Sequence, residues 1–231
     1  MYRRDLLRGI ALAAVPALSR SSATEAASPS SDGPSADEAL RQLLEGNQRF
    51  MKGETTGPRR KPEDFRPLAA GQRPEAIIVG CADSRVPPEL IFDQGVGDLF
   101  IVRVAGNVVG GGGALVKGSI EYGVAELGVP LVMVLGHSEC GVIKAAIKHM
   151  DDRDALPGAI AELVNRLRPA VAKTKGMPGD RLDNTIRANV TLGVETLRTL
   201  RPVLAPAVAG GRVRVVGAVY DLRTGGVVLT T

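Results

Sequence analysis

The sequence has no long run of basic residues and no apolar run long enough to cross a membrane. Its formal charge at neutral pH is +4, and four arginines against one aspartate in residues 1–23 account for +3 of that charge. Nucleic-acid binding needs lysine and arginine gathered on one face, so the nearly neutral remainder of the chain excludes that function class. The apolar stretch at residues 9–18 is too short to cross a bilayer.

Aromatic residues are also scarce, at 3% of the 231 residues, and tryptophan is absent. Hydrophobic residues make up 44% of the chain, charged residues 23%, and glycine occurs 28 times. This composition predicts one domain with a substantial core of small side chains and tight loops. No internal repeat is present. We expect the domain to occupy residues 35–231, with an export signal and a linker at residues 1–34.

The expected signal starts with Arg3 and Arg4, which precede the apolar stretch 9–18 and the small residues 21–23 at a plausible cleavage site. Paired arginines ahead of a short apolar segment resemble a twin-arginine export signal. An ordinary secretory peptide and a disordered basic tail are the alternatives. The pattern predicts a periplasmic or secreted protein without a membrane segment in its mature form.

The mature chain alternates short apolar runs with longer amphipathic segments. The segment that follows Ser35 has the capping-box form Ser-x-x-Glu and predicts a first helix. Further helices are predicted at residues 114–127, 142–150, 159–171 and 184–200. Five β-strands are predicted at residues 76–80, 99–102, 131–135, 213–219 and 227–229. Nearly continuous apolar strands separated by helices favour an α/β fold, a single domain with a mostly parallel sheet flanked by helices on both faces.

Four consecutive glycines at residues 110–113 invite comparison with a phosphate-binding loop. The run is not followed by the Lys-Ser/Thr pair of such a loop, nor by an acidic residue at the spacing of a dinucleotide site. We interpret it as permissive backbone before a helix.

The chemically informative residues follow the first and third predicted strands. His137 and Cys140 come directly after residues 131–135, and Cys81, the other of the two cysteines, follows residues 76–80. Ligands bind beyond the carboxyl ends of the strands in such sheets. Thiolate and imidazole are the ligands that zinc prefers, and catalytic zinc sites have three protein ligands and a fourth position for water. If the two strands are neighbours, these three residues form one candidate metal site.

Two charged residues accompany Cys81 at a regular spacing. Asp83, two positions further on, could reach the metal or its water, and Arg85 could pair with that carboxylate in a bidentate manner. Three other interpretations remain open at this point. They are a surface ion pair between Asp83 and Arg85, a disulfide between Cys81 and Cys140, and a non-catalytic zinc site that only holds the fold.

Taken together, these motifs resemble a β-class carbonic anhydrase. The matching stretches are Cys-x-Asp-x-Arg at 81–85, His-x-x-Cys at 137–140, Gly-Asp-Leu-Phe at 97–100 with Arg103, Ser-Ile-Glu-Tyr at 119–122 and Gly-Ala-Val-Tyr-Asp at 217–221, and the resemblance spans residues 36–229.

The resemblance implies one zinc ion per chain, held by Cys81, His137 and Cys140, with Asp83 and Arg85 as a catalytic dyad beside the open position. It also implies reversible hydration of carbon dioxide to bicarbonate and a proton, and assembly into a homodimer or tetramer. A second, inactive state is implied in which Asp83 leaves Arg85 and becomes the fourth metal ligand. The same scaffold could instead hydrolyse a carbon–sulfur analogue such as carbon disulfide, because fold does not settle substrate.

The chain departs from the family pattern at two points. Some members bind regulatory bicarbonate in a pocket that includes a tryptophan, and Ile78 stands at that position, although Arg103 and Tyr220 match the rest of the pocket. Plant-type members place a glutamine near the substrate, and the nearest candidate, Gln94, is one position early. His149, the remaining histidine, is interpreted as a solvated helical residue rather than a proton shuttle.

Overall fold

The structure is a computed structural model that describes residues 33–230. The export signal predicted around Arg3 and Arg4, and the linker up to residue 32, lie outside the described residues and stay predictions. Among the helices of residues 33–230, none is long and apolar enough to cross a membrane.

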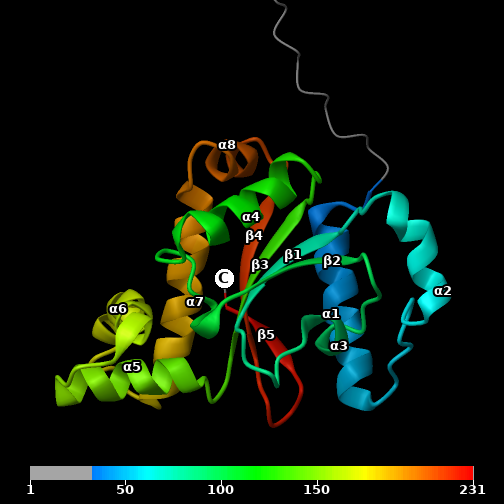
Figure 1. The fold of residues 1–231 in the computed structure, drawn as a ribbon. Coiled ribbons are helices and arrows are strands. Elements are labelled where there is room, and N and C mark those ends of the chain that lie inside the picture. Colours follow the sequence, from blue (N-terminus) through cyan, green and yellow to red (C-terminus); the bar gives the residue numbers. More distant parts are fainter. Residues whose placement is uncertain (1–32, 231) are drawn as a thin grey trace, which may run out of the picture. The chain divides into compact units, whose positions relative to one another are not determined.

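A five-stranded sheet forms the centre of the molecule (Figure 1). The strand order is β2-β1-β3-β4-β5, and every neighbouring pair is parallel except β4 and β5. The bounds are β1 (Ala76–Gly80), β2 (Leu99–Arg103), β3 (Leu131–His137), β4 (Arg214–Tyr220) and β5 (Val227–Leu229). This arrangement confirms the predicted α/β fold, and β1 and β3 are neighbours, as the candidate metal site requires.

The five longer helices of residues 33–230 are α1 (Ala36–Lys52), α4 (Gly113–Ala125), α5 (Gly141–Asp152), α6 (Gly158–Lys173) and α7 (Arg181–Thr199). The capping box that begins α1 is present: the Ser35 hydroxyl accepts a hydrogen bond from the backbone N–H of Glu38, whose carboxylate accepts one from the backbone of Ser35. Shorter helical segments are α2 (Pro62–Phe65), α3 (Pro88–Ile91), α8 (Leu204–Ala209) and the 3-10 turns η1 (Arg66–Ala70) and η2 (Ala105–Asn107).

The two faces of the sheet are covered by different helices because successive side chains of a strand point to opposite faces. In β1, Ile77 and Val79 pack in a cluster with residues of α4, α7 and α8. Ala76 and Ile78 pack in a second cluster with residues of α1 and α3. Figure 1 shows α7 and α8 on one side of the strands and α1 and α3 on the other. The central strands β1, β3 and β4 are therefore buried on both faces, which explains their continuous apolar runs.

A third apolar cluster lies where β1 and β3 end. It brings Cys81 and Cys140 together with apolar residues of α5, α6 and α7, among them Ile143, Leu167 and Ile186. At Gly136, near the end of β3, a Cβ atom would lie 2.7 Å from a methyl group of Val190, so only glycine lets α7 pack this closely. The carboxyl ends of β1 and β3 thus lie against tightly packed side chains of α5, α6 and α7.

Candidate metal centre

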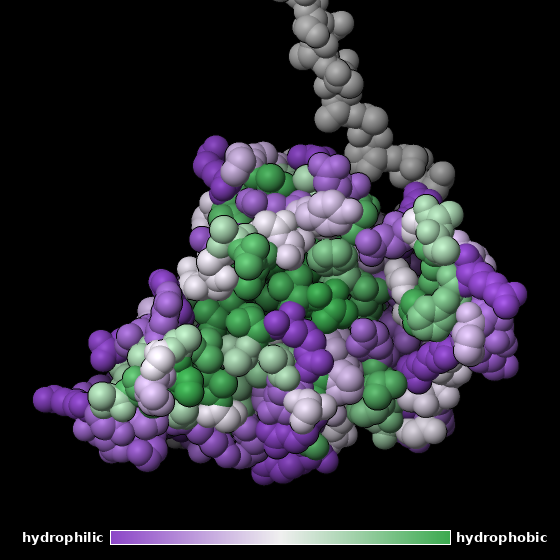
Figure 2. Space-filling view, in the orientation of Figure 1, coloured by the Kyte–Doolittle hydropathy of each residue, from purple (hydrophilic) through white to green (hydrophobic). Residues whose placement is uncertain are grey.

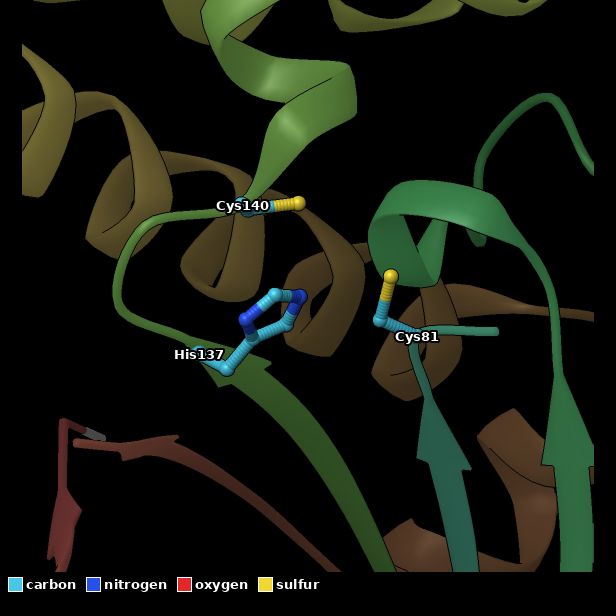
Figure 3. A group of neighbouring side chains, drawn as sticks. All are labelled: Cys81, His137 and Cys140. Atoms are coloured by element: carbon cyan, nitrogen blue, oxygen red, sulfur yellow. The ribbon is translucent and has the colours of Figure 1, made fainter. Parts of the chain in front are cut away.

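Three potential metal ligands converge at the carboxyl ends of β1 and β3 (Figure 3). Cys81 follows β1, His137 is the last residue of β3, and Cys140 is the residue before the first turn of α5. Their ligand atoms all lie within 4.8 Å of one another, and all three residues are buried. We predicted a strand that ended at residue 135. The structure continues it to His137 because that residue still pairs with Tyr220 of β4.

A tight turn between His137 and Cys140 directs the cysteine back towards the histidine. Glu139 has φ +58°, in the left-handed region that non-glycine residues rarely adopt. The Nη2 atom of Arg85 lies 3.4 Å from the Glu139 carbonyl oxygen, to which it donates. This hydrogen bond joins the loop after β1, which carries Cys81, to the turn after β3, which carries Cys140.

The hydrogen bonds of His137 define which ring nitrogen faces the cysteines. Nδ1 lies 2.8 Å from the carbonyl oxygen of Ser138, which can only accept, so Nδ1 carries the proton. Nε2 is buried and has no hydrogen-bond partner among the described residues. A buried nitrogen with a free lone pair is costly unless something binds it. This atom is oriented as a metal ligand.

The sulfur of Cys81 is surrounded by donors. It accepts hydrogen bonds from the backbone N–H groups of Gly106, at 3.2 Å, and Asp83, at 3.4 Å. The thiol of Cys140, followed by the ring of His137 and these N–H groups, lowers the pKa of Cys81 to about 4. The same contact with Cys81, together with burial, raises the pKa of Cys140 above its usual range. Because ionisation of one thiol disfavours ionisation of the other, a nearby cation would favour the state in which both are thiolates.

These observations show that the three residues fit a zinc ion. Both cysteines are free thiols, so the disulfide interpretation of Cys81 and Cys140 finds no support. Two thiolates and one neutral imidazole form the donor set that zinc prefers. A divalent cation would bind the Nε2 atom of His137, which has no partner in residues 33–230, and would offset the repulsion between two adjacent thiolates.

Asp83 and Arg85 form a close ion pair beside the candidate ligands. Arg85 donates from Nε to Oδ1, at 3.0 Å, and from Nη2 to Oδ2 of Asp83, at 2.8 Å, and its backbone N–H also donates to Oδ1. These bonds hold the pKa of Asp83 well below its usual range. Oδ2 lies 3.8 Å from Nε2 of His137. The carboxylate is therefore ionised and directed at the centre of the site rather than at solvent.

The other residues named from the sequence lie at different distances from this centre. Arg103 donates from Nε to the Cys81 carbonyl, at 2.8 Å, and from Nη2 to the Asp83 carbonyl, so it braces the loop after β1. Tyr220 and Ile78 belong to the apolar cluster on the α1 face. Bicarbonate binding at this group stays a prediction.

Gln94 and His149 lie outside the group of candidate ligands. Gln94 lines a cavity of about 300 Å³ together with Glu75 and Asp98, which precede β1 and β2 at their amino ends. Within this chain it is therefore at the opposite end of the strands from Cys81. His149 lies in α5 and pairs through Nδ1 with Asp154, a surface contact.

Several supporting residues could not be found from sequence spacing. Asn189 of α7 is buried and donates from Nδ2 to the Gly106 carbonyl, at 2.9 Å. Gly106, which donates to Cys81, has φ +73°, and its glycine identity was the one available signal. Ser138 gave no signal, because its partners lie in a turn 83 and 84 residues further along the chain.

The fold and the site together define an α/β metalloprotein with its metal centre at the carboxyl edge of a parallel sheet. Comparison with known proteins specifies the class. The family model described as carbonic anhydrase matches residues 76–227. Carbonic anhydrase 2 of Mycobacterium tuberculosis is 41% identical over 191 residues, which cover 83% of this chain and 91% of that protein.

Solved structures give the same result. A tetrameric β-carbonic anhydrase of the ascomycete Sordaria macrospora is 25% identical with a TM-score of 0.66, covering 83% of this chain and 96% of that one. The Coccomyxa β-carbonic anhydrase, solved in complex with acetazolamide, is 29% identical with a TM-score of 0.63, covering 82% and 85%. The chain belongs to the carbonic anhydrase family, in its zinc-dependent β class.

Proposed function

We propose that Cys81, His137 and Cys140 hold one zinc ion per chain and that the protein catalyses the reversible hydration of carbon dioxide to bicarbonate and a proton. The observation that carries the proposal is the buried Nε2 of His137, which has no hydrogen-bond partner in the described part of the chain and faces two thiols and an ionised carboxylate. When bound, zinc acts as a Lewis acid that lowers the pKa of a water molecule towards neutrality, a chemistry known from carbonic anhydrases generally.

The residues of the chain then orient the reactants. Asp83 is ionised, so its Oδ2 can only accept a hydrogen bond, and acceptance fixes the direction in which the attacking oxygen presents its lone pair to carbon dioxide. Arg85 keeps that carboxylate charged and in place through two parallel hydrogen bonds. The apolar residues behind Cys81 and Cys140 keep water away from the sulfur atoms.

The alternative substrate class is a carbon–sulfur analogue of carbon dioxide. We propose to measure hydration of carbon dioxide by stopped flow and hydrolysis of carbon disulfide on the same zinc-loaded preparation. Rapid hydration with negligible hydrolysis is the expected result. Hydrolysis of carbon disulfide without hydration of carbon dioxide would show that the protein catalyses the alternative reaction. A protein that binds one zinc per chain and has neither activity would support the non-catalytic interpretation.

We also propose that the protein forms a homodimer or tetramer through the outer edge of β2, which pairs with no other strand of residues 33–230. Leu99, Phe100 and Ile101 of this edge strand are only partly buried, and Tyr122 of α4, which lies beside Phe100, is half exposed. Figure 2 shows apolar side chains gathered in the middle of the face on which Figure 1 draws β2 and α4. An unpaired strand edge is a template for pairing with another chain. The relative from Sordaria macrospora, described as tetrameric, supports the proposal.

Light scattering after size exclusion tests this interface. Wild type is expected at the mass of a dimer or tetramer, and Tyr122→Glu is expected to shift it towards the monomer. Met177→Glu, at an equally exposed position between α6 and α7, serves as the control and should leave the mass unchanged. A wild-type protein that is monomeric in this measurement would contradict the proposed interface.

Export through the twin-arginine route is proposed from Arg3, Arg4 and the apolar stretch 9–18. That route carries folded proteins, so the metal could be loaded before export. Replacement of both arginines by lysine is expected to retain the protein in the cytoplasm. Unchanged recovery of this variant from the periplasm would contradict the twin-arginine route.

A further inference from the structure

Ser138, the residue after the proposed histidine ligand, is tied to the turn between β4 and β5. Its backbone N–H donates to the Tyr220 carbonyl at 2.8 Å. Its hydroxyl accepts from the N–H of Leu222, at 2.9 Å, and donates to Oδ1 of Asp221, at 3.3 Å. Ser138 is buried, with 7% of its surface exposed. A buried hydroxyl with both roles satisfied fixes the residue that carries it.

The turn that holds Ser138 is itself anchored. Asp221 exchanges backbone hydrogen bonds with Gly225 and Gly226, each at 2.8 Å, which closes the turn. The side chain of Asn47, buried in α1, donates to the Gly225 carbonyl at 2.8 Å and accepts from the N–H of Val227 at 2.9 Å. A connected set of hydrogen bonds therefore runs from Asn47 of α1 through the β4–β5 turn to Ser138 beside the metal centre.

These hydrogen bonds hold the Ser138 carbonyl in place, and this carbonyl accepts the hydrogen bond from Nδ1–H of His137. The next residue, Glu139, is in the left-handed conformation, which is unfavourable for a residue with a Cβ atom and persists only where the surroundings impose it. If the contacts around it were lost, the peptide between Ser138 and Glu139 would rotate towards a more favourable conformation. The direction of the Ser138 carbonyl thus depends on the contacts to the β4–β5 turn.

We propose that Ser138 and Asp221 are positioning residues that fix the ring orientation and tautomer of His137, so that Nε2 faces the two thiols. This inference rests on the proposed role of His137 as a zinc ligand. In metal sites the partner of the second histidine nitrogen typically changes metal affinity about 10- to 100-fold when it is lost. The carbonyl itself cannot be mutated, and Ser138 and Asp221 are the side chains that hold it.

The test compares four variants for zinc affinity, measured by competition with a chelator, and for thermal stability. Ser138→Ala removes the hydroxyl, Ser138→Thr restores it, and Asp221→Ala removes its acceptor. Thr174→Val removes a buried hydroxyl that bonds to Thr185 in the helical layer and serves as the control. Ser138→Ala is expected to weaken zinc binding about 10-fold, with Ser138→Thr close to wild type. Asp221→Ala should weaken binding to a smaller degree, and Thr174→Val should lower stability alone.

A second readout observes the ring directly. The chain has two histidines, so the spectrum of ¹⁵N-histidine-labelled protein shows two rings, and His149→Gln identifies them. The zinc-loaded wild type should show His137 protonated at Nδ1, with a proton that exchanges slowly. In Ser138→Ala this proton should exchange measurably faster.

The outcomes separate this inference from the proposed function. If Ser138→Ala binds zinc as wild type does and only its stability falls, as in Thr174→Val, the inference is wrong and the zinc site stands. If Ser138→Ala does not fold, Asp221→Ala decides, and unchanged zinc affinity in that variant overturns the inference. If His137→Ala retains wild-type zinc affinity, the proposed ligand set fails, and the inference fails with it.

Discussion

Two aspartate–arginine pairs in this protein look alike in isolation and differ in their surroundings. Asp83 pairs with Arg85 beside the metal centre, and Asp93 pairs with Arg49 of α1 at 2.7 Å. The side chain of Asp93 is fully buried, and it also accepts hydrogen bonds from the backbone N–H groups of Thr56 and Gly57. Burial alone would raise the pKa of Asp93, but these bonds bring it below its usual range.

The difference lies in which neighbouring groups are satisfied. Around Asp93 each carboxylate oxygen has partners, and the pair joins α1, the loop after it and the end of α3. Around Asp83 the adjacent Nε2 of His137 is buried with no partner among the described residues. At Asp93 a buried carboxylate has a hydrogen-bond partner on each oxygen and needs no further ligand, whereas the unpartnered Nε2 beside Asp83 fits a bound cation.

The largest predicted effect separates the two regions by metal content. Cys140→Ala removes one of three ligands, so it is expected to lose both zinc and hydration activity. Asp93→Asn, which affects only the closed network, should retain one zinc per chain. Elemental analysis of both purified proteins measures this. A full zinc equivalent in Cys140→Ala would refute the ligand assignment.

The second prediction concerns the two aspartates as chemical groups. Asp83→Asn loses the charge and an acceptor while it keeps the size, and Arg85→Ala releases the carboxylate so that it can turn onto the metal. Both variants should bind zinc yet hydrate carbon dioxide about 10- to 100-fold more slowly per zinc. An exposed ion pair contributes about 0–1 kcal/mol, and its loss would leave turnover intact. Near wild-type rates in both variants would show that the pair is only such a surface contact.

For Asp93 the effect should fall on stability instead. Asp93→Asn weakens several charge-assisted hydrogen bonds in a buried network, so the free energy of unfolding should decrease by about 2–3 kcal/mol. The hydration rate per bound zinc should not change. Chemical denaturation and stopped-flow assays on the same samples test both statements. A reduced rate at unchanged stability would place Asp93 in the catalytic machinery.

The stabilisation from Asp93 should depend on pH in one direction. The pKa of this carboxyl is lowered in the folded protein, so its contribution is fully present above the unfolded pKa of about 3.9 and disappears as the pH falls towards the folded value. The difference in unfolding free energy between wild type and Asp93→Asn should therefore be constant from neutral pH to about 5 and narrow below about 4. If the difference in unfolding free energy widened in acid, the pKa of Asp93 would be raised by folding and not lowered, which would contradict this prediction.

The smallest effect is expected at His149, which bonds to Asp154 at the surface. His149→Gln should leave the rate and pH profile of hydration unchanged, because this ring is outside the group of converging ligands. A slower variant that added imidazole buffer restores would instead identify His149 as a proton shuttle.

The sequence predicts the sheet, and the convergence of Cys81, His137 and Cys140 at its edge, for a physical reason. Buried parallel strands are short runs of β-branched residues, and ligands at their carboxyl ends follow at fixed positions, as Cys81 and His137 do. The short helices α2, α3 and η1 form in segments rich in proline and charge, where no apolar period indicates them.

The supporting contacts of the site have a different origin. Asn189 bonds to Gly106 and Ser138 bonds to Asp221, in each case across 83 residues of sequence. Contacts of this kind depend on how helices and turns pack in space, and no local period or spacing encodes them. For the same reason the buried network of Asp93 was not predicted, since its partners come from α1 and the loop that follows.

The most direct test of the account is a zinc titration of the metal-free protein, with carbon dioxide hydration measured by stopped flow at each addition. We predict activity that rises linearly with added zinc and stops rising at one equivalent per chain, with no rise in the Cys140→Ala protein. Activity that is independent of zinc, or a wild-type protein that binds one zinc per chain and does not hydrate carbon dioxide, would contradict the account.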